Sequence, residues 1–307
     1  SLSLGSRLST PTPSLPQHFR LLLLRFKMPC ARRFVVILLG FSTVFLYTVV
    51  DLVSLSSPIS QPTARVEGDA GKRVVSFSLY GGVNPRYTIG AIANADLLPT
   101  IYPGWEMRVY HDDSVPKIVL DNLRPRPDVT LVDMQNTTIK NERVWRFLVA
   151  SDPAVQCYVV RDVDSRLSKR EKAAVDEWID LGTKFHVMRD HPSHSQFAMS
   201  AGMWGGTREA IPDMEAQLNR YNPSTTFFGD TIFLNSEVWP IARESLVQHD
   251  SFSCGKFSGG KTLPFPTKRI GGEHVGGVYI DGKMRQDDVD KLLRTGVVEK
   301  CAKPTVG

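Results

Sequence analysis

An α/β fold is predicted for most of this chain, because short apolar runs alternate with helical segments from residue 73 onward. The 42% hydrophobic content is ample for a sizeable core, and 307 residues suit one large domain or two small ones. The alternation predicts a doubly wound sheet over residues 73–292, followed by a loosely packed tail over 293–307. In such sheets, ligands bind at the carboxyl ends of the strands.

The strands are predicted where short, β-branched apolar runs end at turn residues. The first run, VVSFSLY, stops at Gly81-Gly82. We expect strands at 74–80, 107–112, 129–134, 157–162 and 185–190.

The helices are predicted from their start and stop signals. A first helix over 87–98 ends at Pro99, and a second covers 142–150. A third follows the Ser-x-x-Glu capping box at 168–171 and closes at Gly182.

An apolar stretch near the amino terminus predicts one transmembrane helix. Residues 34–50 contain no charge, and twelve of the seventeen are Leu, Ile, Val or Phe. Continued to Leu55, a helix would span about 33 Å, enough for a hydrocarbon core near 30 Å. We therefore expect a signal anchor over 34–55. A cleaved signal peptide and a buried core helix are the alternatives.

Charge around this stretch predicts its orientation. Arg32 and Arg33 precede it, so the positive-inside rule keeps residues 1–33 in the cytosol. Everything after residue 55 is then luminal, in a single-pass type II protein of the Golgi or ER membrane. Residues 1–27 are of low complexity, and we interpret them as translated sequence upstream of Met28. Residues 56–72 form a polar stem linker.

The basic balance does not indicate nucleic-acid binding. The formal net charge is +5, but residues 1–33 hold six basic residues and no acidic one. The rest of the chain is therefore slightly acidic, whereas a nucleic-acid-binding domain carries its excess charge on its own folded surface.

Four cysteines are present, and no pair has CxxC spacing. A structural zinc site is therefore not expected. Cys157, Cys254 and Cys301 lie beyond the apolar stretch, and a disulfide between the last two is one possibility. Asn136 begins an Asn-Thr-Thr sequon in a predicted polar turn, which agrees with luminal exposure.

The sharpest chemical signal is Asp162-Val163-Asp164, directly after the apolar run CYVV. Two carboxylates at the carboxyl end of a buried strand are hard oxygen donors, which suit Mn²⁺ or Mg²⁺ bridging to a diphosphate. Such a metal would neutralise the charge that develops on a nucleoside diphosphate leaving group. A pair of turn or capping aspartates is the alternative reading.

The segments YVVRDVDSRLSKREKAAVDEWI, FHVMRDHPSHS, FFGDTIFLNSEVWP and QHDSFSC resemble the D-x-D-containing glycosyltransferases of the GT-A fold. The resemblance covers residues 74–290 and implies a mostly parallel, mixed central sheet. The usual Gly-Gly-x-Tyr-x-Asp lead into the D-x-D is replaced by QCYVVRD, so no numbered family is assigned.

The resemblance also implies roles for individual residues. Those expected to border the nucleotide are Tyr80, Asp112, Asp113, Arg146 and Asp162. Asp230 matches the acidic position that often faces the acceptor or the reacting sugar. His249 matches a carboxy-terminal histidine that joins Asp162 and Asp164 as metal ligand in several D-x-D enzymes, and a histidine bonded to its own loop is the alternative.

Two further residues are candidates on chemical grounds. An inverting enzyme needs a base, for which Asp190 and Asp230 are both available. Trp204 is expected to stack on an acceptor sugar or to lie in the core.

Two motifs are set aside. Residues 255–262 fit the phosphate-loop pattern, but Pro264 and Pro266 forbid the helix that such a loop requires. His191 and His194 flank a proline turn and lack a third ligand nearby, so we expect no metal there.

The sequence as a whole predicts a metal-dependent glycosyltransferase that moves a sugar from a nucleotide-sugar donor to a glycan, protein or lipid acceptor. Two other functions stay open. One is a catalytically silent carbohydrate-binding relative, and the other is a nucleotidyltransferase of similar architecture, which would release pyrophosphate.

Overall fold

The computed structural model of the chain describes residues 21–23, 36–40, 43–45, 71–208, 210–222, 225–295 and 301. These residues fall into two compact units, Ser1–Val66 and Glu67–Gly307.

The first unit contains a small antiparallel sheet in the order β1-β2-β3. Its strands are β1 Leu21–Leu23, β2 Val36–Gly40 and β3 Thr43–Phe45. The described residues of the predicted anchor 34–55 are therefore extended rather than helical. This segment is rich in β-branched residues, and strand pairing satisfies backbone groups that a helix would satisfy internally. Nowhere in the described part of the chain is there a helix both long and apolar enough to cross a membrane.

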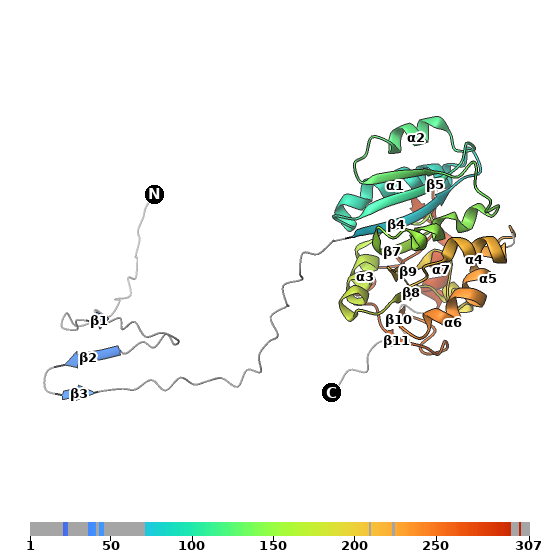
Figure 1. Cartoon of the computed structure of the whole chain (residues 1–307). Helices are drawn as coiled ribbons and strands as arrows, with labels where there is room; N and C mark the ends of the chain where they lie inside the picture. Colours follow the sequence, from blue (N-terminus) through green and yellow to red (C-terminus); the bar gives the residue numbers. More distant parts are fainter. Residues whose placement is uncertain are drawn as a thin grey trace, which may run out of the picture. The chain divides into compact units, whose positions relative to one another are not determined.

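The second unit is built on an eight-stranded sheet with the order β11-β10-β8-β9-β7-β4-β5-β6 (Figure 1). All neighbouring strands are parallel except β9, which runs antiparallel to both β7 and β8. The strands are β4 Lys72–Leu79, β5 Glu106–His111, β6 Val129–Asp133, β7 Val155–Arg161, β8 Phe185–Arg189, β9 Met203–Thr207, β10 Leu246–Asp250 and β11 Lys261–Leu263. A separate hairpin joins β12 Tyr279–Ile280 to β13 Lys283–Met284.

Helical segments connect these strands. They are α1 Pro85–Ile101, α2 Lys117–Leu123, the 3₁₀ helices η1 Glu142–Ser151 and η2 Pro192–Gln196, α3 Lys169–Leu181, α4 Met214–Tyr221, α5 Gly229–Phe233, the π-helical turn η3 Leu234–Val238, α6 Trp239–Ala242 and α7 Gln286–Arg294.

The core lies on both faces of the sheet, because side chains alternate along each strand. In β7, Tyr158 and Val160 join the cluster under η1 and α4–α6, whereas Cys157 and Val159 join the cluster under α1–α3. We refer below to the η1 face and the α3 face. Helices on both faces make the domain doubly wound, as predicted.

The five predicted strands are all present, with small differences at their ends. The prediction for α3 is confirmed in detail, since the Ser168 side chain accepts from the Glu171 amide and Gly182 ends the helix with a φ of 68°. The first helix continues past Pro99 to Ile101, where burial of Leu98 and Ile101 offsets the backbone bond lost in the last turn. The second predicted helix is a 3₁₀ helix, η1.

A buried ion pair joins α3 to the middle of the sheet. Arg161 Nε donates to Glu171 Oε1 at 2.7 Å, and the Tyr102 hydroxyl donates to the same oxygen at 2.7 Å. Arg161 also donates to the carbonyl of Trp204 in β9 at 3.0 Å. The side chains of the ion pair are each 1% exposed, so Glu171 is the charge that makes burial of Arg161 tolerable.

Replacement of Glu171 by Ala is expected to lower the free energy of unfolding by about 3–5 kcal/mol, because it leaves a buried guanidinium uncompensated. Asp176→Ala, which breaks an exposed pair with Lys172 on the same helix, is the control and should cost less than about 0.5 kcal/mol. Urea unfolding of both variants measures the difference. Equal losses would mean that the buried pair has no special weight.

Candidate functional site

A cleft of about 510 Å³ opens where three central strands end. Tyr80 and Gly81 follow β4, and Asp162 follows the neighbouring parallel strand β7. Because β9 is antiparallel, its first residue, Met203, pairs with Arg161 at the same edge. The sheet thus brings the ends of β4 and β7 and the start of β9 together, and all three line the cleft.

Arg146 is fixed in the cleft by two serines of β4. The Ser76 hydroxyl donates to the Arg146 carbonyl at 2.7 Å, and the Arg146 amide donates to Ser78 Oγ at 3.0 Å. These bonds hold η1 against the η1 face of the sheet. The predicted site residue Arg146 is therefore placed by backbone contacts rather than by its own flexible side chain.

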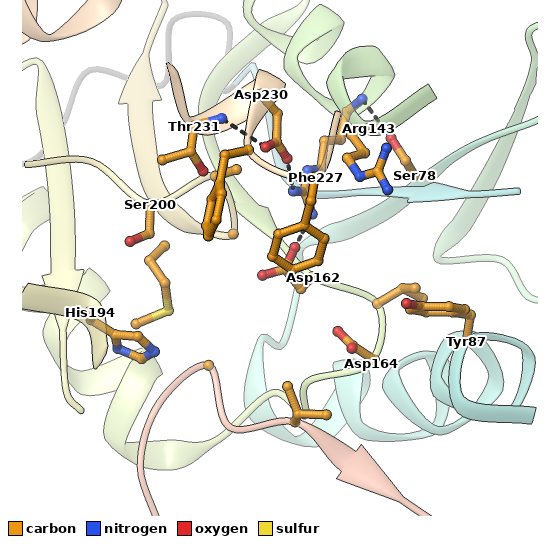
Figure 2. Close-up of a pocket in the computed structure, with 18 of the residues that line it drawn as sticks. Ser78, Tyr87, Arg143, Asp162, Asp164, His194, Ser200, Phe227, Asp230 and Thr231 are labelled. Atoms are coloured by element: carbon orange, nitrogen blue, oxygen red, sulfur yellow. Dashed lines mark hydrogen bonds and ion pairs between the residues drawn. The ribbon is translucent and has the colours of Figure 1, made fainter. Parts of the chain in front are cut away.

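The guanidinium of Arg146 lies between two cleft carboxylates. Its Nη1 donates to Asp162 Oδ1 at 2.5 Å and to the Arg161 carbonyl at 2.9 Å, and its Nη2 contacts Asp230 Oδ2 at 3.2 Å (Figure 2). Burial opposes the charge of Arg146, but Asp162 and Asp230 raise its pKa above the ordinary value. The structure therefore brings Arg146, Asp162 and Asp230 together in one cleft.

Asp164 lies in the same cleft, paired with Arg86. Arg86 Nε donates to Asp164 Oδ2 at 2.6 Å, while the Asp164 carbonyl accepts from the Tyr279 amide at 2.9 Å. Burial and the nearby charge of Asp162 raise the pKa of Asp164 in spite of Arg86. The charge of Asp162 is thus close enough to disfavour the ionisation of Asp164.

Their environment fits a hard divalent cation. Both carboxylates line one cleft, and their mutual repulsion is what such a cation would relieve. A Cβ at Gly202 would collide with the Asp162 carboxylate, so this glycine leaves room for the motif. No cluster of three or more acidic, histidine or cysteine side chains suited to a metal occurs in the described part of the chain. The other oxygen atoms around such a cation would therefore come from a bound substrate and from water.

Aromatic and polar side chains form the rest of the wall. Phe227 is 74% exposed and Phe228 46% exposed, and the Phe228 ring lies 5.6 Å from that of Phe197. Ser200 and His194 also line the cleft (Figure 2). The cleft thus offers carboxylates, guanidinium groups and an exposed aromatic surface within one volume.

Three histidines pack beside the cleft. The ring centroids of His191 and His274 are 4.5 Å apart, and those of His191 and His194 are 5.6 Å apart. Burial lowers the pKa of His191 to about 4 and that of His194 to about 3, and it also lowers the pKa of His274. The Asp190 amide donates to His194 Nδ1 at 3.3 Å, so the neutral ring carries its proton on Nε2.

The residues predicted beside the nucleotide divide into two groups. Tyr80 lines the cleft, with its ring 6.1 Å from that of Trp145. Asp112 and Asp113 do not line it. Asp112 Oδ1 instead accepts from the Ser114 amide at 3.1 Å, and Ser114 Oγ accepts from the Gly81 amide at 2.8 Å. The Asp112 turn therefore supports the cleft wall from outside.

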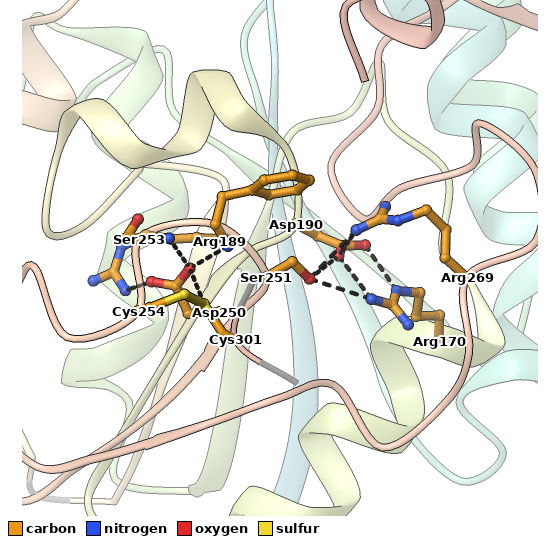
Figure 3. Close-up of a disulfide and its surroundings, with 10 residues drawn as sticks. Arg170, Arg189, Asp190, Asp250, Ser251, Ser253, Cys254, Arg269 and Cys301 are labelled. Carbon is orange, nitrogen blue, oxygen red and sulfur yellow. Dashed lines mark hydrogen bonds and ion pairs between the residues drawn. A yellow bond between two sulfur atoms is a disulfide. The ribbon is translucent and has the colours of Figure 1, made fainter. Parts of the chain in front are cut away.

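The proposed base Asp190 lies outside the cleft, and this prediction is corrected. Arg170 binds both of its carboxylate oxygens at 2.9 Å, Arg269 donates at 2.5 Å, and Ser251 donates at 2.8 Å (Figure 3). The Val275 amide donates as well, at 3.0 Å. Burial alone would favour the neutral acid, but these arginines hold the pKa of Asp190 below its usual value. Asp190 does not line the cleft, so it is not placed to take a proton from a substrate bound there.

The metal-ligand role of His249 and the acceptor-side role of Trp204 are also corrected, and Trp204 takes the core position that was its alternative. His249 is fully buried in β10, where its Nδ1 meets His186 Nε2 at 2.8 Å and its Nε2 meets Glu177 at 2.9 Å. Both ring nitrogens are occupied away from the cleft, so His249 is not available to the D-x-D carboxylates. Trp204 is 0% exposed and packs edge-on against Phe147 and Tyr158, which leaves no ring face for a sugar.

The remaining sequence features are placed as expected. Cys254 and Cys301 form a disulfide with a Cα–Cα distance of 5.2 Å, the pairing named as one possibility (Figure 3). The phosphate-loop pattern ends in the edge strand β11 rather than a helix. Asn136 is exposed in a turn.

Arg86, Arg143, His194 and Phe227 line the cleft but were missed by the sequence reasoning. Phe227 carried a weak signal, because it belongs to a pair of aromatic residues just before Asp230. Arg86 lies in the first turn of α1, but the helix was predicted only from residue 87, so nothing in the sequence pattern singled Arg86 out. Arg143 and His194 carried no signal either.

Comparisons with known proteins give only distant matches. No described protein family matches the chain, and no curated protein is similar to it. A 4-diphosphocytidyl-2C-methyl-D-erythritol synthase from Anaerococcus prevotii is similar at 11% identity over 58% of this chain and 87% of that chain, with a TM-score of 0.39. The galactosyltransferase LgtC, in complex with donor and acceptor sugar analogues, is similar at 14% identity over 58% and 73%, with a TM-score of 0.38.

The mannosyltransferase PcManGT from Pyrobaculum calidifontis, in complex with GDP-Man and Mn²⁺, is similar at 15% identity over 63% of this chain and 55% of that chain, with a TM-score of 0.39. The eight-stranded sheet of this chain combines parallel strands with the antiparallel strand β9. It is the mostly parallel, mixed arrangement that the sequence resemblance implied.

Stability should fall in mild acid because of the histidines beside the cleft. Their pKa values are lowered in the folded chain, so protons bind more readily to the unfolded chain, whose histidines titrate near 6.5. The contribution of the three neutral histidines to the free energy of unfolding is fully present above pH 6.5 and is lost as the pH falls below it. Each histidine contributes a slope of at most about 1.4 kcal/mol per pH unit.

Urea unfolding at pH 7, 6 and 5 measures this slope, and His194→Gln should reduce it by the share of one histidine. Equal free energies of unfolding at pH 7 and pH 5 would contradict the expectation.

Proposed function

We propose that this chain is a metal-dependent glycosyltransferase that moves a sugar from a nucleotide-sugar donor to an acceptor hydroxyl. The observation that carries the proposal is the pair Asp162 and Asp164, which line one cleft at the carboxyl end of β7 together with three arginines, Arg86, Arg143 and Arg146. Carboxylates and guanidinium groups in one cleft suit a ligand that itself combines a cation with a diphosphate.

Asp162 and Asp164 would hold Mn²⁺ or Mg²⁺. When bound, the metal would supply positive charge to a leaving diphosphate. The arginines of this chain add fixed positive charge around the same group, and they act in a partly buried cleft where such charge is weakly screened.

Asp230 is the carboxylate that we propose for the acceptor. Its Oδ2 meets Arg146, and its Oδ1 accepts from the Thr231 amide at 2.7 Å. Burial raises the pKa of Asp230. It follows the exposed ring of Phe227, so an acceptor sugar could pack against the ring while one hydroxyl meets Asp230. In an inverting reaction, Asp230 would take the proton from that hydroxyl.

We further propose that residues 34–55 anchor the protein in the Golgi or ER membrane, with the catalytic domain in the lumen. Two observations support this. Asn136 is exposed in a turn, where it is accessible for glycosylation, and the disulfide Cys254–Cys301 is of the kind that persists in oxidising compartments.

Asp164→Asn should abolish Mn²⁺-dependent release of nucleoside diphosphate from the donor while leaving the protein folded, because it keeps the shape but removes the charge. The assay incubates residues 56–307 with a panel of UDP- and GDP-sugars. Asp176→Asn, on the exposed side of α3, is the control with the same chemical change.

Full activity in a folded Asp164→Asn protein would contradict the metal role. Pyrophosphate release from nucleoside triphosphates, with no reaction of nucleotide sugars, would favour a nucleotidyltransferase instead.

In sealed microsomes, residues 73–307 are expected to be protected from protease, and Asn136 should carry a glycan that Asn136→Gln removes. Digestion of this domain without detergent would show the opposite orientation.

A further inference from the structure

Arg86 holds the second carboxylate of the D-x-D motif. Its Nε donates to Asp164 Oδ2 at 2.6 Å, and its Nη2 contacts the same oxygen. The Asp164 side chain is 8% exposed, whereas that of Arg86 is 34% exposed. The carboxylate is thus enclosed, and its partner is open to the cleft.

The position of Arg86 is electrostatically unfavourable without Asp164. It lies in the first turn of α1, where the helix dipole disfavours a cation and where no acidic residue offsets it. Within the described residues, Asp164 is the one carboxylate that it contacts. Arg86 is therefore held in place mainly by the Asp164 carboxylate, which is also a group that a divalent cation would bind.

The other cleft arginines are not placed to make this exchange. Arg146 also pairs with a carboxylate of the motif, Asp162, at 2.5 Å. Arg146 is buried and fixed by Ser78 and by the Arg161 carbonyl. Arg143 donates to the Thr225 carbonyl at 3.1 Å and contacts neither carboxylate of the motif. Of the three, Arg86 combines direct contact with the motif and freedom to move into the cleft.

The charges of the cleft also balance. Three arginines and three aspartates, Asp162, Asp164 and Asp230, line it, so it is formally neutral before a ligand enters. A divalent cation and a doubly charged diphosphate together keep it neutral, whereas either one alone leaves an excess of charge in a low-dielectric site.

We propose that Arg86 exchanges between two anions: it pairs with Asp164 in the free protein, and it turns to the donor diphosphate when a divalent cation takes Asp164. This exchange makes metal and diphosphate bind together rather than singly. The proposal rests on the metal-dependent glycosyltransferase function, and it adds a role for Arg86 in coupling the two ligands.

The test measures Mn²⁺ binding alone, by the loss of the free Mn²⁺ signal in electron paramagnetic resonance. Arg86→Gln should bind Mn²⁺ at least about 10-fold more tightly than the unaltered protein, because Asp164 no longer has to leave a charged hydrogen bond. Arg143→Gln removes the same charge from the same cleft without freeing a carboxylate. It should change the affinity by less than about 3-fold.

Two further measurements locate the effect. Combined with Asp164→Asn, Arg86→Gln should lose its gain in Mn²⁺ affinity. At saturating Mn²⁺, Arg86→Gln should bind UDP or GDP about 10-fold more weakly, because one contact to the diphosphate is missing. If Arg86→Gln fails to fold, as judged by its thermal melt, Arg86→Lys replaces it. Lysine keeps the charge but not the fork, and it should show the same changes to a smaller degree.

Equal Mn²⁺ affinity in the unaltered protein and in Arg86→Gln would overturn the exchange, even if the protein transfers sugar. Unchanged UDP and GDP affinity in Arg86→Gln would overturn it as well. Absence of Mn²⁺ binding in every variant, with no release of diphosphate from any nucleotide sugar, would instead remove the proposed function on which it rests.

Discussion

The buried guanidinium of Arg146 is the element on which the cleft depends. It meets two carboxylates, Asp162 and Asp230, that come from segments nearly seventy residues apart and would otherwise repel each other across a low-dielectric space. The guanidinium is free to contact both carboxylates because Ser76 and Ser78 bind the backbone of η1 rather than its side chains. The polar residues inside the otherwise apolar run VVSFSLY thus have a structural explanation. They dock the helix that carries the central positive charge.

The antiparallel strand β9 gives the cleft its second wall. It enters the sheet between β7 and β8, so its amino end lies beside the carboxyl end of β7. Close approach requires small residues there, since a Cβ at Gly202 would strike Asp162 and one at Gly205 would strike the Tyr158 carbonyl. Glycine weakens the local strand signal, and this is why MWGGT was not predicted as a strand. Gly205, which helped to hide β9 in the sequence, lets the strand approach β7, and Gly202, just before the strand, makes room for the D-x-D motif.

The sequence could predict the parallel strands β4 to β8, helix α3 with both its caps, and the sheet edge that carries the D-x-D motif, because each depends on a local pattern. It could not predict which face a residue beyond a strand end would take. Asp162, just beyond β7, contacts Arg146 of η1, the face on which Tyr158 and Val160 lie. His249 shares the α3 face with Val247, and Asp190 follows Met188 toward α3. Asp162, His249 and Asp190 look equivalent in the sequence, because each is an acidic or histidine residue at the end of a strand. Side chains alternate between the two faces of a sheet, however, and of these three only Asp162 points into the cleft.

The misplaced Asp190 also explains how the segment after β11 is held. No strand or helix of more than a few residues occurs in the described chain between β11 and α7, so this segment gains little from regular hydrogen bonding. Instead, Asp190 holds the segment by accepting hydrogen bonds from the Arg269 side chain and the Val275 amide. Gly276, the residue after Val275, lines the cleft. A carboxylate saturated by arginines is costly to bury but fixes direction as well as distance. The residue predicted as a base therefore serves the same cleft from behind, by fixing the wall that faces the D-x-D motif.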